Sequence, residues 1–260
     1  MREGFNLSPE ELSNPEKKEK VELKHRDVYN SPEWKTLNPI TRAHLILVAE
    51  GAKNGAYTRG DYKNFASIID KLGLEASMNS EEGDLDPVFT VAKPEAMSEN
   101  IREEIMASDK KESLTEGFKR EGKFLGYPDC CVTEYERASL VEYETGEKNV
   151  NIDQEIEEAG TYPKELDYLP PTFTPCSVDC EKALAMAEKH KDILLEADPE
   201  AAEEIRKINI LGYPEVNKDE IEKLEQDENE AEKLEFLRRT AKGEMLEWAW
   251  KRLQEERDEK

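Results

Sequence analysis

The sequence has few aromatic residues, few histidines and no long apolar run. Aromatic residues make up 7% of the 260 residues, and the chain contains 3 histidines. Its longest apolar stretch, at positions 45–49, is much shorter than the roughly 20 residues of a membrane-spanning helix. The first residues also lack an apolar core of signal-peptide length. We therefore expect a cytoplasmic protein that does not cross a membrane.

Basic residues are outnumbered by acidic ones. The chain has 37 Lys and Arg against 61 Asp and Glu, a formal net charge of -24 at pH 7. Proteins bind nucleic acids by releasing counterions from phosphates with Lys and Arg, and anionic membranes attract basic segments in the same way. The composition disfavours both partners. Salt screens the self-repulsion of such a chain, which leaves open whether it comes from a halophilic source.

Sequence motifs of the common enzyme classes are also missing. The chain has no phosphate-binding loop, no dinucleotide fingerprint, no nucleophile elbow and no HExxH zinc motif. The sequence therefore indicates no reaction and no substrate, and leaves open whether the protein is an enzyme.

Three regions differ in composition. Residues 1–35 are polar and interrupted by prolines, and we predict a loosely ordered arm. Residues 36–215 contain all four cysteines and form the predicted main domain. Residues 216–260 are acidic with an apolar helical stripe, which predicts an amphipathic helical segment that docks on the body. The same stripe would suit a protein partner, whose identity the sequence does not indicate.

Apolar spacing and capping residues predict an α+β fold that is predominantly helical with a small antiparallel sheet. Asn38 and Pro39 begin a helix that ends near residue 50, and Thr58 caps a second helix that ends at Gly73. Further helices are predicted at about 95–107, 113–125, 128–143 and 178–196. Strand composition occurs at 74–78 and 87–92, which can pair as a hairpin, and at 208–211.

All four cysteines lie in two short clusters. "FLGYPDCCV" contains Cys130 and Cys131, and "TPCSVDC" contains Cys176 and Cys180. Each cluster follows a proline and precedes a predicted helix, where the helix dipole favours a thiolate. In a reducing cytosol, clustered cysteines are more often metal ligands or working thiols than structural disulfides.

Three interpretations of the cysteines remain open. The first is a zinc or iron-sulfur site made by all four. If Cys130 and Cys131 are helical they diverge by about 100°, which favours a variant in which Cys130, Cys176 and Cys180 bind and leave one position open. The second is a thiol-disulfide redox protein. The third is a non-enzymatic interaction scaffold with inert structural thiols.

Histidine is the other common metal ligand, and none of the three fits the clusters well. His190 lies about 15 Å along a continuous helix from Cys180, and His44 lies on the apolar stripe of its helix. We predict that both are packing residues and that His25 is exposed.

The two cysteine motifs resemble those of an uncharacterised, mainly archaeal family with a GYPxCC motif and a PCSxxC helix. The matching positions are Gly126, Tyr127, Pro128, Cys130, Cys131, Pro175, Cys176, Ser177 and Cys180. The resemblance covers about residues 113–196 and implies that the clusters form one site, supported by Tyr127, Pro128, Pro175 and Ser177. Relatives are expected to carry a histidine before PCS, where this chain has Thr174, and this departure weakens a mixed Cys/His site.

Overall fold

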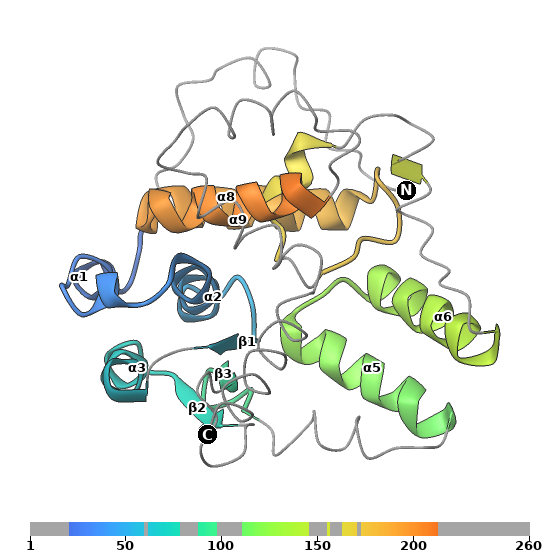
Figure 1. The fold of residues 1–260 in the computed structure, drawn as a ribbon, viewed down its shortest axis with the longest axis horizontal. Coiled ribbons are helices and arrows are strands. Elements are labelled where there is room, and N and C mark those ends of the chain that lie inside the picture. Colours follow the sequence, from blue (N-terminus) through green and yellow to red (C-terminus); the bar gives the residue numbers. More distant parts are fainter. Residues whose placement is uncertain are drawn as a thin grey trace, which may run out of the picture.

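The fold is mainly helical with one small antiparallel sheet, as Figure 1 shows. The computed structural model describes residues 21–59, 62–78, 88–97, 111–145, 155–156, 163–170 and 173–212. Within these ranges the helices are α1 (Arg26–Tyr29), α2 (Pro39–Ala49), α3 (Tyr62–Lys71), α5 (Lys111–Leu125), α6 (Asp129–Thr145), α8 (Glu181–Ala197) and α9 (Pro199–Gly212). Two 3-10 helices, η1 (Trp34–Thr36) and η2 (Lys164–Tyr168), and three strands, β1 (Gly55–Arg59), β2 (Glu75–Met78) and β3 (Val88–Ala92), complete them. The predicted α+β class is confirmed.

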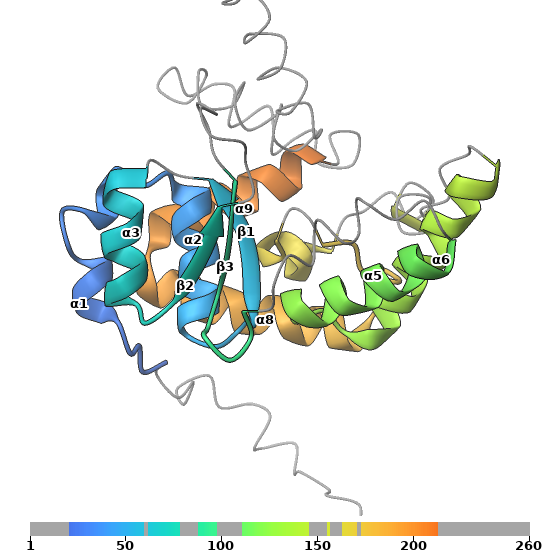
Figure 2. The ribbon, with the colours of Figure 1, turned by 90° about the horizontal axis from the view of Figure 1, so that it is seen from below.

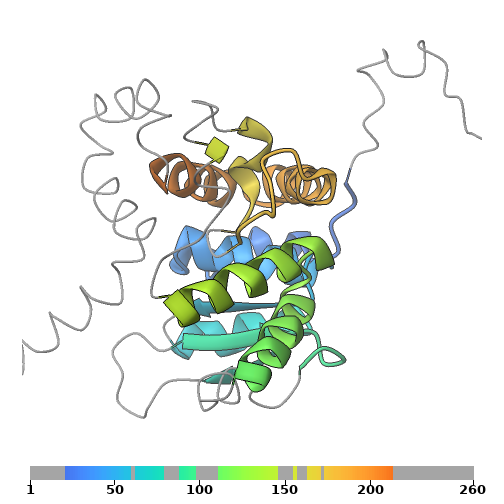
Figure 3. The same cartoon turned by 90° about the vertical axis from the view of Figure 1, so that its right-hand side faces the viewer.

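Helix α2 lies in the middle of the molecule. It begins as predicted, because the Asn38 side chain accepts a hydrogen bond from the Thr41 amide at 2.8 Å and Pro39 occupies the first turn. One side of α2 contacts β1 and β3, and the other contacts α8 and α9. Figure 3 shows the resulting layers, with α8 and α9 above α2 and the sheet below it. Because α2 is covered from both sides, its residues from Thr41 to Ala49 are buried.

The sheet has the strand order β1-β3-β2, and both pairings are antiparallel. The predicted pairing of β2 with β3 is confirmed, whereas β1 was not predicted. Thr58, predicted to cap α3, lies instead in β1 opposite Phe89, and its hydroxyl is 3.0 Å from that of Thr41 in α2. The prediction was wrong because a β-branched threonine suits a strand as well as a helix cap, and only the packing of α2 distinguishes them.

Residues 208–211, predicted to be a strand, belong to helix α9. The Asp198 carboxylate accepts a hydrogen bond from the Ala201 amide at 3.3 Å, and Pro199 opens the first turn. Ile205 and Ile208 are one turn apart and both buried. The prediction was wrong because a four-residue segment with three apolar residues fits a strand or a buried helix equally, and the signal for the start of the helix lies ten residues upstream.

A buried ion pair joins α2 to the beginning of α9. Arg42 Nη1 lies 2.5 Å from Asp198 Oδ2, and both side chains are almost completely buried. Trp34 Nε1 donates to the same carboxylate at 2.9 Å. Although burial opposes it, the Trp34 hydrogen bond and the charge of Arg42 lower the pKa of Asp198. The carboxylate therefore stays ionised and connects three parts of the core.

Parts of the predicted end regions lie outside the described residues. This holds for residues 1–20, for the C-terminal segment 216–260 and for most of the helix predicted at 95–107. Within 21–35, Tyr29 and Trp34 are buried in the α2 core, so that core begins earlier in the chain than its proline content suggests. The domain boundaries themselves stay a prediction. Among the described residues, every helix is too short or too polar to span a lipid bilayer.

Candidate metal centre

The first cysteine pair follows a tight turn between α5 and α6. Gly126 has a φ of 76°, and the Tyr127 amide donates to the Gly122 carbonyl at 2.8 Å, a helix end that favours glycine. The Pro128 carbonyl then accepts from the Cys131 amide at 2.9 Å in the first turn of α6. These local bonds place Cys130 and Cys131 at the N-terminus of α6, as the sequence predicted.

The second pair flanks a compact turn before α8. Cys180 is the residue that precedes the helix, and Cys176 lies outside it. The turn is held by two side chains: Ser177 donates to Asp179 at 2.8 Å, and the Val178 amide donates to Glu155 at 3.0 Å. The Glu155 contact was not predicted, because it joins positions 23 residues apart in a region without periodic spacing of apolar residues.

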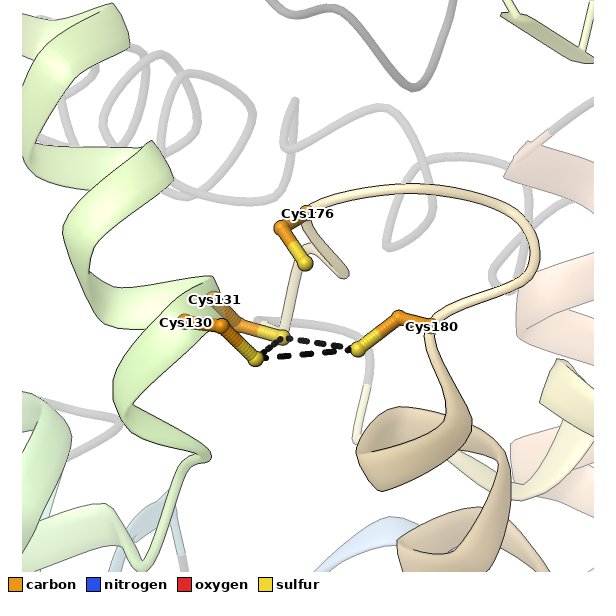
Figure 4. A group of neighbouring side chains, drawn as sticks. All are labelled: Cys130, Cys131, Cys176 and Cys180. Carbon is orange, nitrogen blue, oxygen red and sulfur yellow. Dashed lines mark hydrogen bonds between the residues drawn. The ribbon is translucent and has the colours of Figure 1, made fainter.

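The four thiols come together in one group, with their sulfur atoms all within 4.8 Å of one another. Figure 4 shows Cys130 and Cys131 approaching from α6, and Cys176 and Cys180 from the turn and the start of α8. The sulfur of Cys180 lies 3.7 Å from that of Cys130 and 3.8 Å from that of Cys131. Four cysteines so arranged can hold a metal ion.

The expectation that neighbouring cysteines diverge is wrong for this pair. The sulfurs of Cys130 and Cys131 are 3.9 Å apart and both face Cys180. Two Cα atoms one residue apart are about 3.8 Å from each other, so a rotation about each short side chain brings the sulfurs to one side despite the helical twist. Spacing alone does not determine that rotation.

No disulfide joins the four cysteines, because their sulfurs are much farther apart than the roughly 2.05 Å of a disulfide bond. Cys131 and Cys180 are buried, Cys176 is half-buried and Cys130 is exposed. The buried pair belongs to a small hydrophobic cluster, which we name the cysteine cluster, with Leu166, Leu169, Phe173, Ala183 and Ala187. The site thus lies where this cluster meets the surface.

The pKa values of the thiols differ across the group. Burial raises the pKa of Cys131 well above its usual range, against a hydrogen bond from the Cys176 amide, and burial raises that of Cys176 to about 11. Burial also opposes ionisation of Cys180, but the Ala183 amide and hydrogen bonds from the other thiols lower its pKa. Without a cation, Cys180 is therefore the thiol that ionises most readily of these three.

The residues predicted to support the site lie next to the cysteines in the chain, and their supporting role stays a prediction. The Tyr127 ring packs against Phe173 with centroids 4.6 Å apart, and Lys53 Nζ lies 5.5 Å from the Tyr127 ring centroid. Pro128 directly precedes α6 and accepts hydrogen bonds from the Cys131 and Val132 amides of its first turn, and Pro175 is buried immediately before Cys176. Ser177 contacts Asp179 within the turn and does not approach as a ligand.

Residues 51–54, between α2 and β1, contact α5, which precedes the first cysteine pair, and α8, which follows the second, and the sequence analysis did not predict these contacts. Asn54 donates to the Lys123 carbonyl of α5 at 2.9 Å, and Lys189 of α8 donates to the Gly51 carbonyl at 3.2 Å. The Asn54-Gly55 dipeptide is a turn signal that marks the segment, but it does not indicate what the turn contacts.

The histidines take no part in the group of possible metal ligands found among the described residues. His44 and His190 are buried in the core, as predicted. Burial, followed by the charge of Lys53, lowers the pKa of each to about 3. Both imidazoles are therefore neutral packing residues at ordinary pH. His25, predicted to be exposed, is half-buried.

Comparisons with known proteins identify a family and no function. Neither the curated proteins nor the solved structures contain a match to this chain. The model of the family described as "Protein of unknown function (DUF483)" matches residues 90–215, which include both cysteine motifs. Residues 90–215 are therefore similar to this family, whose description names no function.

Proposed function

We propose that Cys130, Cys131, Cys176 and Cys180 bind one zinc ion. The observation that carries this proposal is the spacing of the sulfurs. Zinc-thiolate bonds of about 2.3 Å in a tetrahedron put neighbouring sulfurs about 3.8 Å apart. The three separations among Cys130, Cys131 and Cys180 are 3.9, 3.7 and 3.8 Å. Cys176, within 4.8 Å of the others on a turn outside the helix, supplies the fourth ligand.

An iron-sulfur cluster fits this spacing less well than a single ion. A cluster attaches its thiolates to different irons, and the irons and sulfides between them hold the cysteine sulfurs farther apart than one shared ion does. Here all four sulfurs lie within 4.8 Å. A single iron with four thiolates would suit the same geometry and is distinguished from zinc by its colour.

A centre with four cysteine ligands is closed, and a closed zinc site is structural rather than catalytic. The ion would join the start of α6 to the start of α8, which belong to segments 50 residues apart in the chain. The alternative with an open position requires Cys131 to turn away, whereas its sulfur lies 3.8 Å from that of Cys180. The proposed function is therefore that of a zinc-stabilised domain.

The test is an anaerobic purification of the full chain followed by metal analysis, a visible spectrum and a count of free thiols. We expect one zinc per chain and no visible absorption. The Cys130→Ser and Cys180→Ser variants should lose the zinc. Thr133→Ala is the matched control, because Thr133 is an exposed residue of α6 whose hydroxyl bonds to the Asp129 carbonyl of its own helix, and it should keep the metal. A metal-free protein with four titratable thiols would overturn the proposal.

A redox function is the second candidate, favoured by the exposed Cys130 and the lowered pKa of Cys180, whose sulfurs are 3.7 Å apart. In thiol-disulfide exchange these two thiols would become a disulfide while the disulfide of a partner protein becomes two thiols. A metal-free protein that loses two thiols reversibly on treatment with oxidised glutathione would support this function, and retained zinc with unreactive thiols would contradict it.

A further inference from the structure

The four cysteines of the candidate metal centre differ in their access to solvent. Cys130 is exposed and Cys176 is half-buried, whereas Cys131 and Cys180 are buried. Figure 4 shows the sulfur of Cys130 in close contact with those of Cys131 and Cys180. A reagent from solvent therefore reaches the group first at Cys130, and a second thiol lies a short distance from that sulfur.

Exposure and reactivity coincide at Cys130 when the group holds a metal ion. Cysteines that bind a metal are deprotonated, and the thiolate is the form of cysteine that reacts with oxidants. Susceptibility to oxidation follows thiolate character together with exposure. Three of the four ligands of the proposed zinc site are buried or half-buried, so the site is open to an oxidant at one ligand.

Cys180 is the thiol best placed to form a disulfide with Cys130. Their sulfurs are 3.7 Å apart, and rotation about two short side chains brings them to the roughly 2.05 Å of the bond. The sulfur of Cys131 is 3.9 Å away, but a disulfide between adjacent residues strains the peptide that joins them. That peptide lies in the first turn of α6, where the Cys131 amide donates to the Pro128 carbonyl. The disulfide between the two helices avoids this strain.

The charges around the group favour an uncharged oxidant. The chain has a formal net charge of -24, and three exposed acids, Asp129, Asp179 and Glu181, lie directly beside Cys130 or Cys180 in the sequence. Like charges repel an approaching anion, and oxidised glutathione carries a net negative charge at pH 7. Hydrogen peroxide is small and neutral, so it reaches Cys130 without this repulsion.

We propose that Cys130 is a peroxide-reactive site whose oxidation to a disulfide with Cys180 releases the zinc ion, an inference that rests on the proposed zinc function. The Cys130 thiolate attacks one peroxide oxygen, the O–O bond breaks and hydroxide leaves, which gives a sulfenic acid. The Cys180 thiolate then attacks the Cys130 sulfur, the S–O bond breaks and a second hydroxide leaves. The two sulfurs lose two electrons, which reduce the peroxide, and the ion loses two of its four ligands.

The disulfide joins the same two helix starts as the metal ion. Helix α6 packs mainly against α5, and Figure 2 shows both helices on the side of β1 that is remote from α3. The cysteines connect the start of α6 to that of α8. Oxidised protein should therefore lose zinc and keep this connection, whereas chelation of zinc from the reduced protein removes both. Amide hydrogen exchange in α6 should accordingly be slower after oxidation than after chelation.

The test adds hydrogen peroxide to the zinc-loaded full chain, whose zinc content is measured beforehand. A chromophoric chelator reports released zinc against a sample without oxidant, and mass spectrometry of unreduced peptides identifies the disulfide. We expect release of one zinc per chain and a disulfide between Cys130 and Cys180. Oxidised glutathione at the same concentration should release zinc at least about tenfold more slowly. Release with a different disulfide, or equal rates with both oxidants, would overturn the proposal.

Two histidine variants test the assignment of Cys130. Histidine is a zinc ligand that forms no disulfide, so Cys130→His and Cys176→His should both keep zinc. Peroxide should release zinc at least about tenfold more slowly from Cys130→His than from the wild type, and at nearly the wild-type rate from Cys176→His. Equal rates in the two variants would contradict the assignment, and the disulfide found in the wild type depends on neither variant.

The same measurements separate this inference from the proposed function. A full chain purified without zinc would overturn both. A zinc-loaded chain that keeps its zinc in peroxide would overturn the inference alone and leave a structural zinc site.

Discussion

The hydrophobic cluster around α2 and the cysteine cluster are stabilised in different ways. Among the described residues, the α2 cluster contains 23 buried side chains and the cysteine cluster contains 7, two of which are cysteines. The buried ion pair between Arg42 and Asp198 adds to the stability of the region around the larger cluster. Burial of apolar area stabilises a cluster roughly in proportion to its size, so the smaller one depends on an additional bond between its segments. The proposed zinc ion would supply that bond.

The largest expected effect is that of metal removal on the cysteine cluster. Structural zinc sites contribute on the order of 10 kcal/mol to the folded state of the segments they join. After chelation, amide hydrogen exchange in α6 and in residues 173–180 should accelerate by several orders of magnitude. Exchange in α2 should change little, because the contacts of α2 involve the other cluster. Equal acceleration in both clusters would show that they are one cooperative unit.

The second effect concerns the ion pair of the α2 cluster. Asp198→Asn removes the charge that pairs with buried Arg42 but keeps a side chain that can cap α9. Arg42 keeps a second partner, the exposed Glu200 carboxylate at 2.7 Å, but loses the buried one, so the free energy of unfolding in urea should fall by about 3 kcal/mol, the lower end of the range for a broken buried ion pair.

The control for Asp198→Asn is Glu203→Gln, which breaks a half-exposed pair with Arg206 on the same helix and should cost less than about 1 kcal/mol. Zinc content should be unchanged in both variants. Loss of zinc in Asp198→Asn without loss of global stability would reverse the proposed roles of the two clusters.

The parts of the fold that the sequence predicted are those determined by neighbouring residues. Asn38 with Pro39 marks the start of α2, and Gly126 marks the end of α5, because capping bonds span only a few positions. Strand β1 was missed because Thr58 is equally suited to a cap, and the choice depends on Thr41 across the layer. The residues next to Thr58 in the sequence do not indicate its contact with Thr41.

The candidate site was predicted in membership but not in geometry. All four cysteines of the group were identified, because thiols concentrated at helix starts are chemically unusual. The sequence did not predict that the sulfurs of Cys130 and Cys131 converge, because this depends on side-chain rotation. It did not predict the Glu155 contact either, because that contact depends on the fold.

The third effect concerns the buried charge of Lys53, which lacks the carboxylate partner that Arg42 has. Lys53 is nearly fully buried, no carboxylate among the described residues forms an ion pair with it, and burial lowers its pKa to about 7. Lys53→Met should therefore raise the free energy of unfolding at pH 7, on the order of 2 kcal/mol, in contrast to the loss in Asp198→Asn.

The pH dependence of Lys53→Met gives an internal check. Between pH 7 and 10.5 the unfolded chain keeps the lysine proton while the folded chain has released it, so stability rises with pH in the wild type. The variant should lack this rise, and the difference between the two proteins should therefore shrink as pH increases. A constant difference across this range, measured by urea unfolding, would mean that Lys53 stays charged in the fold.

The smallest effect comes from two glycines of equal backbone conformation, one in each region. Gly126 and Gly73 have φ angles of 76° and 64°, and both Gly→Ala changes should cost about 1 kcal/mol of stability through left-handed strain. A Cβ at Gly73 meets no atom within 4 Å, whereas at Gly126 it lies 3.5 Å from the backbone of Lys53 and Asn54. The 3.5 Å distance is an ordinary contact, so the difference between the two sites is their position: Gly126 directly precedes Tyr127 and the turn into α6, where we expect relaxation of the strained backbone to shift the start of α6. Only Gly126→Ala should therefore weaken zinc binding, which competition with a chromophoric chelator would measure. Equal zinc affinities of the two variants would show that the cysteines adjust independently of the turn before them.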